Sequence, residues 1–339
     1  KKYLTKKNKP YFIAEIGINH NGKLSIAKRM IKMSKKAGAD AVKFQKRDAI
    51  DLLNFGLKTK KPIGYLSKNE KDIPKNKVKF GGWVYPDIRL EFNKQQYFEI
   101  KKFCKKINID LIVTPWDEKS VDMLVKLKVK ILKIASIDAN NYLFCKYVAK
   151  KKYPTIISSG MCTYDELIKT NKIFNNFNCP HMFMHCTSAY PSKDEDKNLN
   201  CIPFLKKKLN TDIGFSGHGT SFVGSIGSIP LGATVIEKHV TLNKKMAGPD
   251  HAASLDFKEF KELVDNCKRV YSAMGSSEKK FLKSESMLHS ILQRKIVLRK
   301  PIHKGQRLNE KYLKTALTYK KGGILPKDLD KVSNRKVKN

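Results

Sequence analysis

The strongest constraint on the fold is an alternation of short apolar runs with longer amphipathic segments. Residues 11–17 (YFIAEIG) read as a buried strand, residues 24–37 as an amphipathic helix, and residues 40–45 as a second strand. From about residue 90 the alternation resumes, and around residues 211–236 one strand, helix and strand together take roughly 20 to 25 residues, which is one βα period of a parallel sheet. We therefore expect parallel strands joined by helices.

The whole pattern contains eight such units. The remaining predicted strands are 110–114, 131–134, 155–158, 181–185, 211–215 and 233–236. The remaining predicted helices are 94–106, 119–127, 142–150, 164–174, 221–231 and 257–274. Eight βα units predict a TIM (β/α)8 barrel of about 275 residues. An open doubly wound sheet is the alternative, but no G-x-G-x-x-G turn supports it.

Two segments interrupt this pattern. Residues 46–91 form a long insertion, which we interpret as a lid over the active-site face because long loops in compact domains are often functional. After a catalytic domain at 1–275, residues 276–285 read as a polar linker. Residues 286–339 then predict a small β-rich domain with strands at 295–298 and 301–305. A domain this small has little hydrophobic core of its own, and we expect it to pack against the barrel or against a second subunit.

The composition raises the question of a nucleic-acid partner. The formal net charge is +38, from 69 Lys and Arg against 31 Asp and Glu. Only eight of these basic residues are Arg, and Lys is spread almost evenly along the chain. A nucleic-acid surface usually concentrates its charge and adds Arg and exposed aromatic residues. We therefore expect no nucleic-acid partner, although the charge favours the approach of anionic substrates.

Cysteine usage and hydropathy bear on where the protein works. The seven cysteines are scattered and contain no C-x-x-C pair, which is typical of a reducing compartment rather than of a disulfide framework or a zinc ribbon. Residues 1–10 lack the apolar core of a signal peptide, and no apolar run approaches the ~18 residues needed to span a bilayer. We expect a cytoplasmic protein without a membrane partner.

Two histidines stand at the ends of neighbouring predicted strands. His218 follows the run at 211–215, and His239 follows the run at 233–236, 21 positions later. Both are expected at the C-terminal edge of the barrel, where TIM barrels carry their active sites. Two converging imidazoles are a reasonable divalent-metal site. From this pair alone, two unrelated strand-end histidines remain an alternative.

The other strand ends also carry polar side chains. They are Glu15, Lys43, Thr114, Lys133, Ser136, Asp138, Ser158, Ser188, Tyr190 and Ser216. Two lysines and several hydroxyls around one cavity suit a phosphorylated anion. A buried carboxylate suits proton transfer or the orientation of a sugar hydroxyl. Together they favour a catalytic face rather than isolated strand termini.

The sequence resembles the sialic acid synthase family, the phosphoenolpyruvate-dependent N-acylneuraminate synthases. The resemblance is carried by collinear motifs at 14–22, 42–46, 132–136, 140–141, 158–161, 185–191, 213–218 and 248–251. The C-terminal region is similar to the antifreeze-like (SAF) domain of this family. The resemblance implies a metal-dependent condensation of phosphoenolpyruvate with N-acetylmannosamine, or a related 2-acetamido sugar, and water. The products would be a nine-carbon 2-keto acid and phosphate, released by C–O cleavage.

The resemblance also implies roles for individual residues. His218 and His239 would bind Mn2+ or Mg2+. The phosphoenolpyruvate would be held by Lys43, Thr114, Lys133, Ser136, Ser158, Ser188 and Ser216. Glu15 would orient the sugar and assist proton transfer, and Asp138, Tyr190 and Asp250 would lie beside the sugar. A domain-swapped homodimer is the implied assembly.

Three departures leave the sugar open. Asp138 stands where some bacterial members carry Glu, and Ser188 where some carry Asn. Residues 318–323 lack the Arg that some bacterial members send into the partner's site. The last feature is similar to the eukaryotic type, which uses the 6-phosphorylated sugar; legionaminic or pseudaminic acid synthesis is a further alternative.

Two other functional hypotheses compete with the synthase interpretation. The first is a metal-free Schiff-base aldolase with Lys43 or Lys133 as the nucleophile. The second is a module that binds nucleic acid or ice, which would leave the polar barrel face without a purpose.

Overall fold

The computed structural model describes residues 9–48, 79–80, 83–84, 90–318 and 322–338. The chain divides into two compact units, Lys1–Gly275 and Ser276–Asn339. Within the described residues no helix is both long enough and apolar enough to cross a membrane.

The first unit is a closed barrel of eight parallel strands. The strands are β1 (Tyr11–Gly17), β2 (Ala41–Lys46), β5 (Asp110–Pro115), β6 (Ile131–Ile134), β7 (Thr155–Ser158), β8 (His181–Cys186), β9 (Ile213–Gly217) and β10 (Val235–His239). Their order around the barrel is β1-β10-β9-β8-β7-β6-β5-β2, so that β2 closes the ring against β1. The predicted TIM barrel is confirmed.

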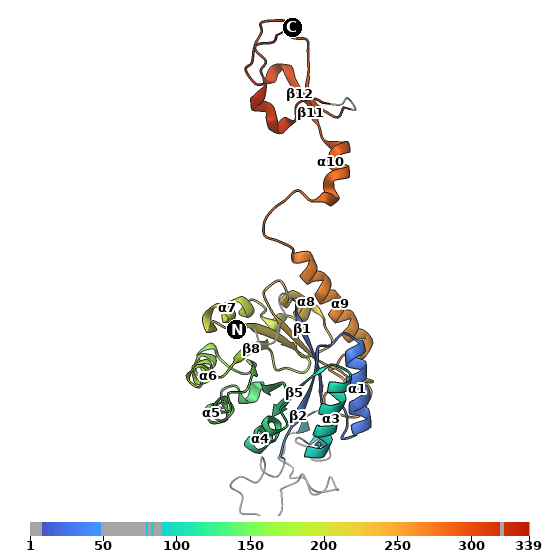
Figure 1. The fold of residues 1–339 in the computed structure, drawn as a ribbon, viewed down its shortest axis with the longest axis vertical. Helices are drawn as coiled ribbons and strands as arrows, with labels where there is room; N and C mark the ends of the chain where they lie inside the picture. The colour runs from blue at the N-terminus through green and yellow to red at the C-terminus, as the bar shows by residue number, and fades with distance from the viewer. Residues whose placement is uncertain (1–8, 49–78, 81–82, 85–89, 319–321, 339) are drawn as a thin grey trace, which may run out of the picture. The chain divides into compact units, whose positions relative to one another are not determined.

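Helices lie around the outside of these strands, as Figure 1 shows. They are α1 (Leu24–Lys36), α3 (Lys94–Lys106), α4 (Glu118–Lys126), α5 (Tyr142–Lys150), α6 (Tyr164–Asn176), α7 (Cys201–Leu209), α8 (Val223–Ser228) and α9 (Phe257–Met274). Several begin at a side chain that satisfies the free backbone N–H groups of the first turn. Asn93, Thr163 and Asp256 each form a capping box, at the starts of α3, α6 and α9.

Two of these helices differ from the prediction. Helix α7 is not among the predicted helices, because Pro203 interrupts the periodic pattern. In the structure this proline lies in the first helical turn, where its missing N–H costs nothing. Helix α8 is shorter than the predicted 221–231. Glycine and serine fill much of α8, and both are weak helix formers.

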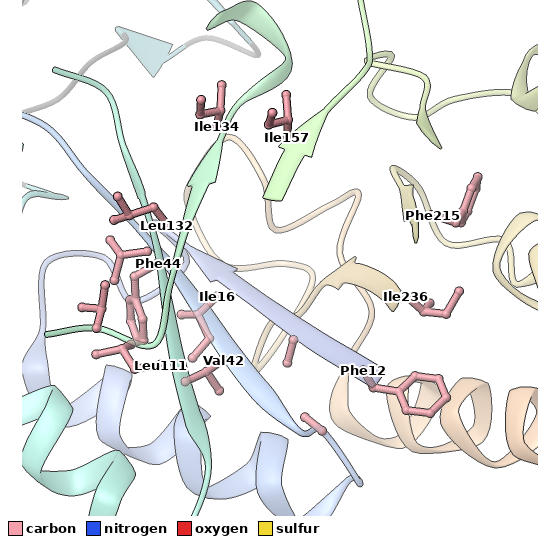
Figure 2. Packing of buried hydrophobic residues seen from close by; sticks show 14 of the residues in the cluster. Phe12, Ile16, Val42, Phe44, Leu111, Leu132, Ile134, Ile157, Phe215 and Ile236 are labelled. Atoms are coloured by element: carbon pink, nitrogen blue, oxygen red, sulfur yellow. The ribbon is translucent and has the colours of Figure 1, made fainter. Parts of the chain in front are cut away.

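The hydrophobic core has two layers because successive side chains of a strand point to opposite faces. On β1, Phe12, Ala14 and Ile16 belong to the outer layer between strands and helices, whereas Tyr11 and Ile13 belong to the barrel interior. Figure 2 shows outer-layer residues of several strands, among them Val42, Phe44 and Leu111. The interior layer comprises Tyr11, Ile13, Ala41, Ile112, Ile131, Ile156, Met182, Met184 and Val235. This apolar plug fills the barrel and supports the polar layer at its C-terminal end.

The predicted lid at 46–91 lies mostly outside the described residues. The strands that the structure describes there are β3 (Lys79–Phe80) and β4 (Trp83–Val84), an antiparallel pair.

The second unit contains α10 (Ser286–Leu292) and an antiparallel pair, β11 (Lys295–Leu298) with β12 (Leu313–Ala316). The predicted strand at 301–305 is wrong. Pro301 has no N–H to give to a ladder, and Gly305 turns the chain with φ of +84°. The strand that pairs with β11 is β12 instead. Assignment of this unit to the SAF type stays a prediction.

Candidate active site

A layer of polar side chains lies directly above the apolar plug. Alternation along β1 turns Glu15 to the same side as Ile13, and the other strands contribute in the same way. The residues of this layer are Glu15, Lys43, Thr114, Lys133, Ser158, Cys186, Ser216, Glu237 and His239, and all of them except the half-buried His239 are buried. The barrel therefore encloses ionisable groups that must be paired with each other or with a ligand.

Lys43 is held between two carboxylates. Its Nζ lies 3.2 Å from Oε2 of Glu15 and 3.3 Å from Oε1 of Glu237. The same ammonium donates a hydrogen bond of 3.3 Å to the Thr114 hydroxyl. Burial lowers the pKa of Lys43, but Glu15 and Glu237 outweigh burial and raise it above its ordinary value. Lys43 is thus a permanent cation at the centre of the barrel.

Glu237 joins both lysines. Its Oε1 also lies 3.8 Å from Nζ of Lys133 and accepts a hydrogen bond of 3.1 Å from the Ser216 hydroxyl. Lys133 in turn donates to the Ser158 hydroxyl. Glu237 is not among the predicted site residues. Its position two residues before His239 on a strand, and so on the same inward face, is the signal that could have found it.

The two carboxyl groups have opposite protonation preferences. Burial raises the pKa of Glu15 above its usual range, and the neighbouring Glu237 charge adds to this, although Lys43 opposes it. Burial also acts on Glu237, but Lys133 and Lys43 outweigh it and lower the pKa of Glu237 to about 2. Two carboxyls with separated pKa values are typical of acid–base sites. Glu237 is therefore the fixed anion, and Glu15 is the carboxyl suited to exchange a proton.

The two predicted metal ligands lie next to each other. The ring centroids of His218 and His239 are 5.7 Å apart, and the Tyr190 ring lies 4.2 Å from the first and 6.0 Å from the second. Nδ1 of His218 lies 2.9 Å from the Thr187 carbonyl oxygen, so a proton on Nδ1 leaves Nε2 as a lone-pair donor. Nδ1 of His239 is buried without a hydrogen-bond partner and lies 3.9 Å from Asp250.

These features fit a divalent metal ion with two protein ligands. An unpartnered imidazole nitrogen is what an ion would satisfy, and burial lowers the pKa of His239 to about 4, so that its imidazole is neutral. Within the described ranges, no group of three or more His, Cys, Asp or Glu side chains is arranged as a metal site. Water or substrate oxygens would complete the coordination.

A second set of hydroxyls surrounds Gly160, just beyond β7. A Cβ on Gly160 would lie 2.3 Å from the Ser188 hydroxyl and 2.8 Å from that of Ser136. The Cys186 thiol lies 3.4 Å from the Ser136 oxygen and 3.6 Å from the Ser188 oxygen. Glycine is required here because the two loops and the thiol approach its backbone closely.

The remaining predicted site residues, Asp250 and Asp138, differ in how close they lie to the polar layer. Asp250 lies near Glu15, since both carboxylates approach Gly17. A Cβ on Gly17 would lie 3.6 Å from Asp250 and 3.2 Å from Glu15. Asp138 accepts a hydrogen bond of 3.2 Å from Asn141 and has no ion pair with the central lysines among the described contacts. The structure thus joins Asp250 to the site but leaves Asp138 in a local loop contact.

Comparison with known proteins now decides the family. The sequence model of the NeuB family matches residues 30–279. This chain belongs to the NeuB family.

Named relatives of this NeuB family member cover nearly its whole length. The human N-acetylneuraminate-9-phosphate synthase is 36% identical, with 96% of this chain and 88% of the relative covered. The N,N'-diacetyllegionaminic acid synthase of Legionella pneumophila is 34% identical, with 95% and 88% covered. Pseudaminic acid synthases of Campylobacter jejuni also match. The predicted resemblance to sialic acid synthases is confirmed, and the relatives support an enzyme of the synthase class.

A solved structure shares the fold. The N-acetylneuraminic acid synthetase of Leptospira borgpetersenii, in complex with citrate, superimposes with a TM-score of 0.70 at 30% identity. The match covers 84% of this chain and 91% of that chain.

Proposed function

We propose that this chain is a nonulosonic acid synthase. It condenses phosphoenolpyruvate with an N-acylated hexosamine and water, and it releases phosphate. The single observation that carries the proposal is the pair of buried lysines, Lys43 and Lys133, fixed among hydroxyls beside the histidine pair. The names of the relatives supply the product class.

Phosphoenolpyruvate is a dense anion with a carboxylate and a phosphate. Lys43 and Lys133 offer it point charges, and the hydroxyls of Thr114, Ser158 and Ser216 already bond to these lysines or to Glu237. Ser136 and Ser188 add hydroxyls around Gly160. Because these donors are held in place before the anion arrives, binding requires little reorganisation.

The reaction forms one C–C bond and replaces the C–O bond to phosphate by a C–O bond from water. The enol carbon of phosphoenolpyruvate attacks the aldehyde carbon of the open-chain sugar, and water adds to the carbon that carries the phosphate. As the keto group forms and phosphate departs, one proton of this water leaves with the phosphate and the other restores the proton that Glu15 gives up. The former aldehyde oxygen gains negative charge and needs a proton. Glu15 supplies it, since burial raises the pKa of this carboxyl and makes it the more readily protonated of the two buried glutamates. Glu237 stays ionised and keeps the lysines in place.

His218 and His239 are the residues that would hold the divalent metal, Mn2+ or Mg2+. When bound, such an ion polarises a carbonyl oxygen and stabilises negative charge on it. The Thr187 carbonyl fixes the His218 ring for this role, and Asp250 lies beside the His239 ring.

The sugar would lie beside Tyr190 and Asp250, next to the histidine pair. N-acetylmannosamine, its 6-phosphate and diacetamido-trideoxy sugars are the candidates, because proteins named for each type of product match at 30% to 36% identity. A panel of these sugars, with the mass of the keto acid product measured, identifies the substrate.

The decisive experiment combines this panel with His239→Ala and with complete metal removal by chelation. We expect phosphate release in the parent protein and its loss in both treatments, with the circular dichroism spectrum of the variant unchanged. Activity that survives metal removal would contradict the metal-dependent reaction. It would favour the Schiff-base aldolase, for which the lowered pKa of the buried Lys133 is the one supporting feature.

A further inference from the structure

Arg47, one residue beyond β2, is among the most buried side chains of the barrel. Its side chain is 1% exposed, and its Nη1 lies 2.6 Å from Oε1 of Glu91, which is itself 7% exposed. The Arg47 backbone N–H donates to the other Glu91 oxygen at 3.0 Å. The guanidinium carbon lies 4.6 Å above the Trp116 ring. Arg47 is therefore fixed in position and direction by three separate contacts.

The guanidinium also faces Gln45 on β2. Nη2 of Arg47 donates to Oε1 of Gln45, and Nε2 of Gln45 donates to Oε1 of Glu15 at 3.0 Å. Because a guanidinium has donors and no acceptor, it decides which way round the Gln45 amide lies. The oxygen must face Arg47, so the NH2 group must face Glu15.

The packing leaves little freedom around this contact. A Cβ on Gly17 would lie 3.2 Å from Oε1 of Glu15 and 3.3 Å from Nε2 of Gln45. The Gln45 backbone carbonyl accepts a hydrogen bond of 2.6 Å from Tyr97. The second oxygen of Glu15 is paired with Lys43 at 3.2 Å. Both oxygens of Glu15 are thus oriented, one by Lys43 and the other by Gln45.

We propose that Arg47 and Glu91 are positioning residues for Glu15, acting through the Gln45 amide. The inference rests on the proposed function, in which Glu15 handles a proton. Without Arg47, the amide of Gln45 can turn and present its oxygen to the Glu15 carboxylate, which pushes the two groups apart. A carboxyl displaced by a fraction of an ångström transfers its proton less well.

A pair that served stability alone would behave differently. Buried ion pairs contribute little net stability because the cost of removing both charges from water offsets their attraction. A structural role would also make the loss of Arg47 independent of Gln45. A positioning role makes the two losses overlap, since both act through the same hydrogen bond to Glu15.

The test is a double-mutant cycle in the full-length protein. We compare Arg47→Met, Gln45→Met and the double variant, measuring kcat and KM for both substrates by phosphate release. Methionine keeps the apolar stem of each side chain. In Arg47→Met the Glu91 carboxylate retains a cation, because Nζ of Lys46 lies 3.8 Å away. Glu99→Gln, which breaks the outer Lys28–Glu99 pair, is the matched control.

We expect each single variant to lower kcat about 10- to 100-fold. KM for phosphoenolpyruvate should stay within about threefold, because Lys43 and Lys133 are unchanged, and the double variant should be no slower than Gln45→Met. The control should match the parent protein. Should Arg47→Met fail to fold, Glu91→Gln enters the same cycle with the same expectation.

Three outcomes overturn the proposal. The first is a double variant whose loss of kcat is the product of the two single losses, and the second is an unchanged kcat in Arg47→Met. Either result would leave the proposed function intact and remove only the positioning role. A parent protein that releases no phosphate with any sugar of the panel would instead overturn the proposed function, and the positioning role with it.

Discussion

Replacing Glu237 by glutamine is expected to destabilise the barrel strongly, although the change is nearly isosteric. The polar layer contains two buried lysines, Lys43 and Lys133, and two buried glutamates, Glu15 and Glu237, of which Glu237 is the fixed anion. Glu237→Gln removes the fixed anion that both lysines contact and leaves buried positive charge without its partner. The variant therefore tests whether the fixed anion of the site is Glu237.

The magnitude follows from the distances. Glu237 lies 3.3 Å from the Lys43 ammonium and 3.8 Å from that of Lys133. At an effective dielectric constant of about 20, each contact is worth roughly 4–5 kcal/mol before desolvation is subtracted. Removing one partner of a buried pair costs about 3–5 kcal/mol overall. For a barrel of this size that corresponds to a fall in Tm of roughly 6–20 °C.

Thermal and urea unfolding followed by circular dichroism measure the loss. The matched control is Glu99→Gln, which removes a carboxylate 2.7 Å from Lys28 on the barrel surface. The side chains of that pair are 34% and 42% exposed, so the expected loss is below about 1 kcal/mol. Phosphoenolpyruvate should raise the Tm of Glu237→Gln more than that of the parent protein, because it restores negative charge beside the lysines. A variant as stable as the control would refute an ionised Glu237.

Two further predictions concern packing and pH. Gly160→Ala should raise KM for phosphoenolpyruvate at least about tenfold and cost about 1–3 kcal/mol of stability, since the new methyl group would overlap the Ser188 and Ser136 hydroxyls; an unchanged KM would contradict the role of these serines. His20, stacked 4.0 Å from Phe92, has its pKa lowered to about 3 by burial, with Arg47 adding to the effect. Below pH ~6.5 the His20 imidazole binds a proton in the unfolded chain but stays neutral in the folded chain. The free energy of unfolding should therefore fall by about 2 kcal/mol at pH 5. His20→Phe should remove this part of the pH dependence, and parallel unfolding curves at pH 7 and 5 check it.

Much of the barrel could be predicted because its signals are local. A strand that is apolar on both faces and a helix with one apolar face each leave a pattern within about ten residues. The eight predicted strands all exist, and the order of parallel strands follows from their order in the chain. Where the local signal was weak, the prediction was wrong. Helix α7 was not predicted because Pro203 interrupts its pattern, and a strand was predicted at 301–305 where the structure has none.

The candidate site was predictable only as a list of strand-end residues. Alternation along β1 and β10 determines that Glu15 and His239 point inward. By itself, the sequence thus determined the barrel and the chemical types gathered at its C-terminal face.

Only the tertiary structure decided which of these groups are partners. Glu15, Lys43 and Glu237 meet because β1 lies between β2 and β10, a closure that brings the two ends of the barrel sequence together. The pairing separates the pKa values of Glu15 and Glu237, although both are buried glutamates. Burial and charge depend on neighbours more than 200 positions away, and no local pattern encodes such distances.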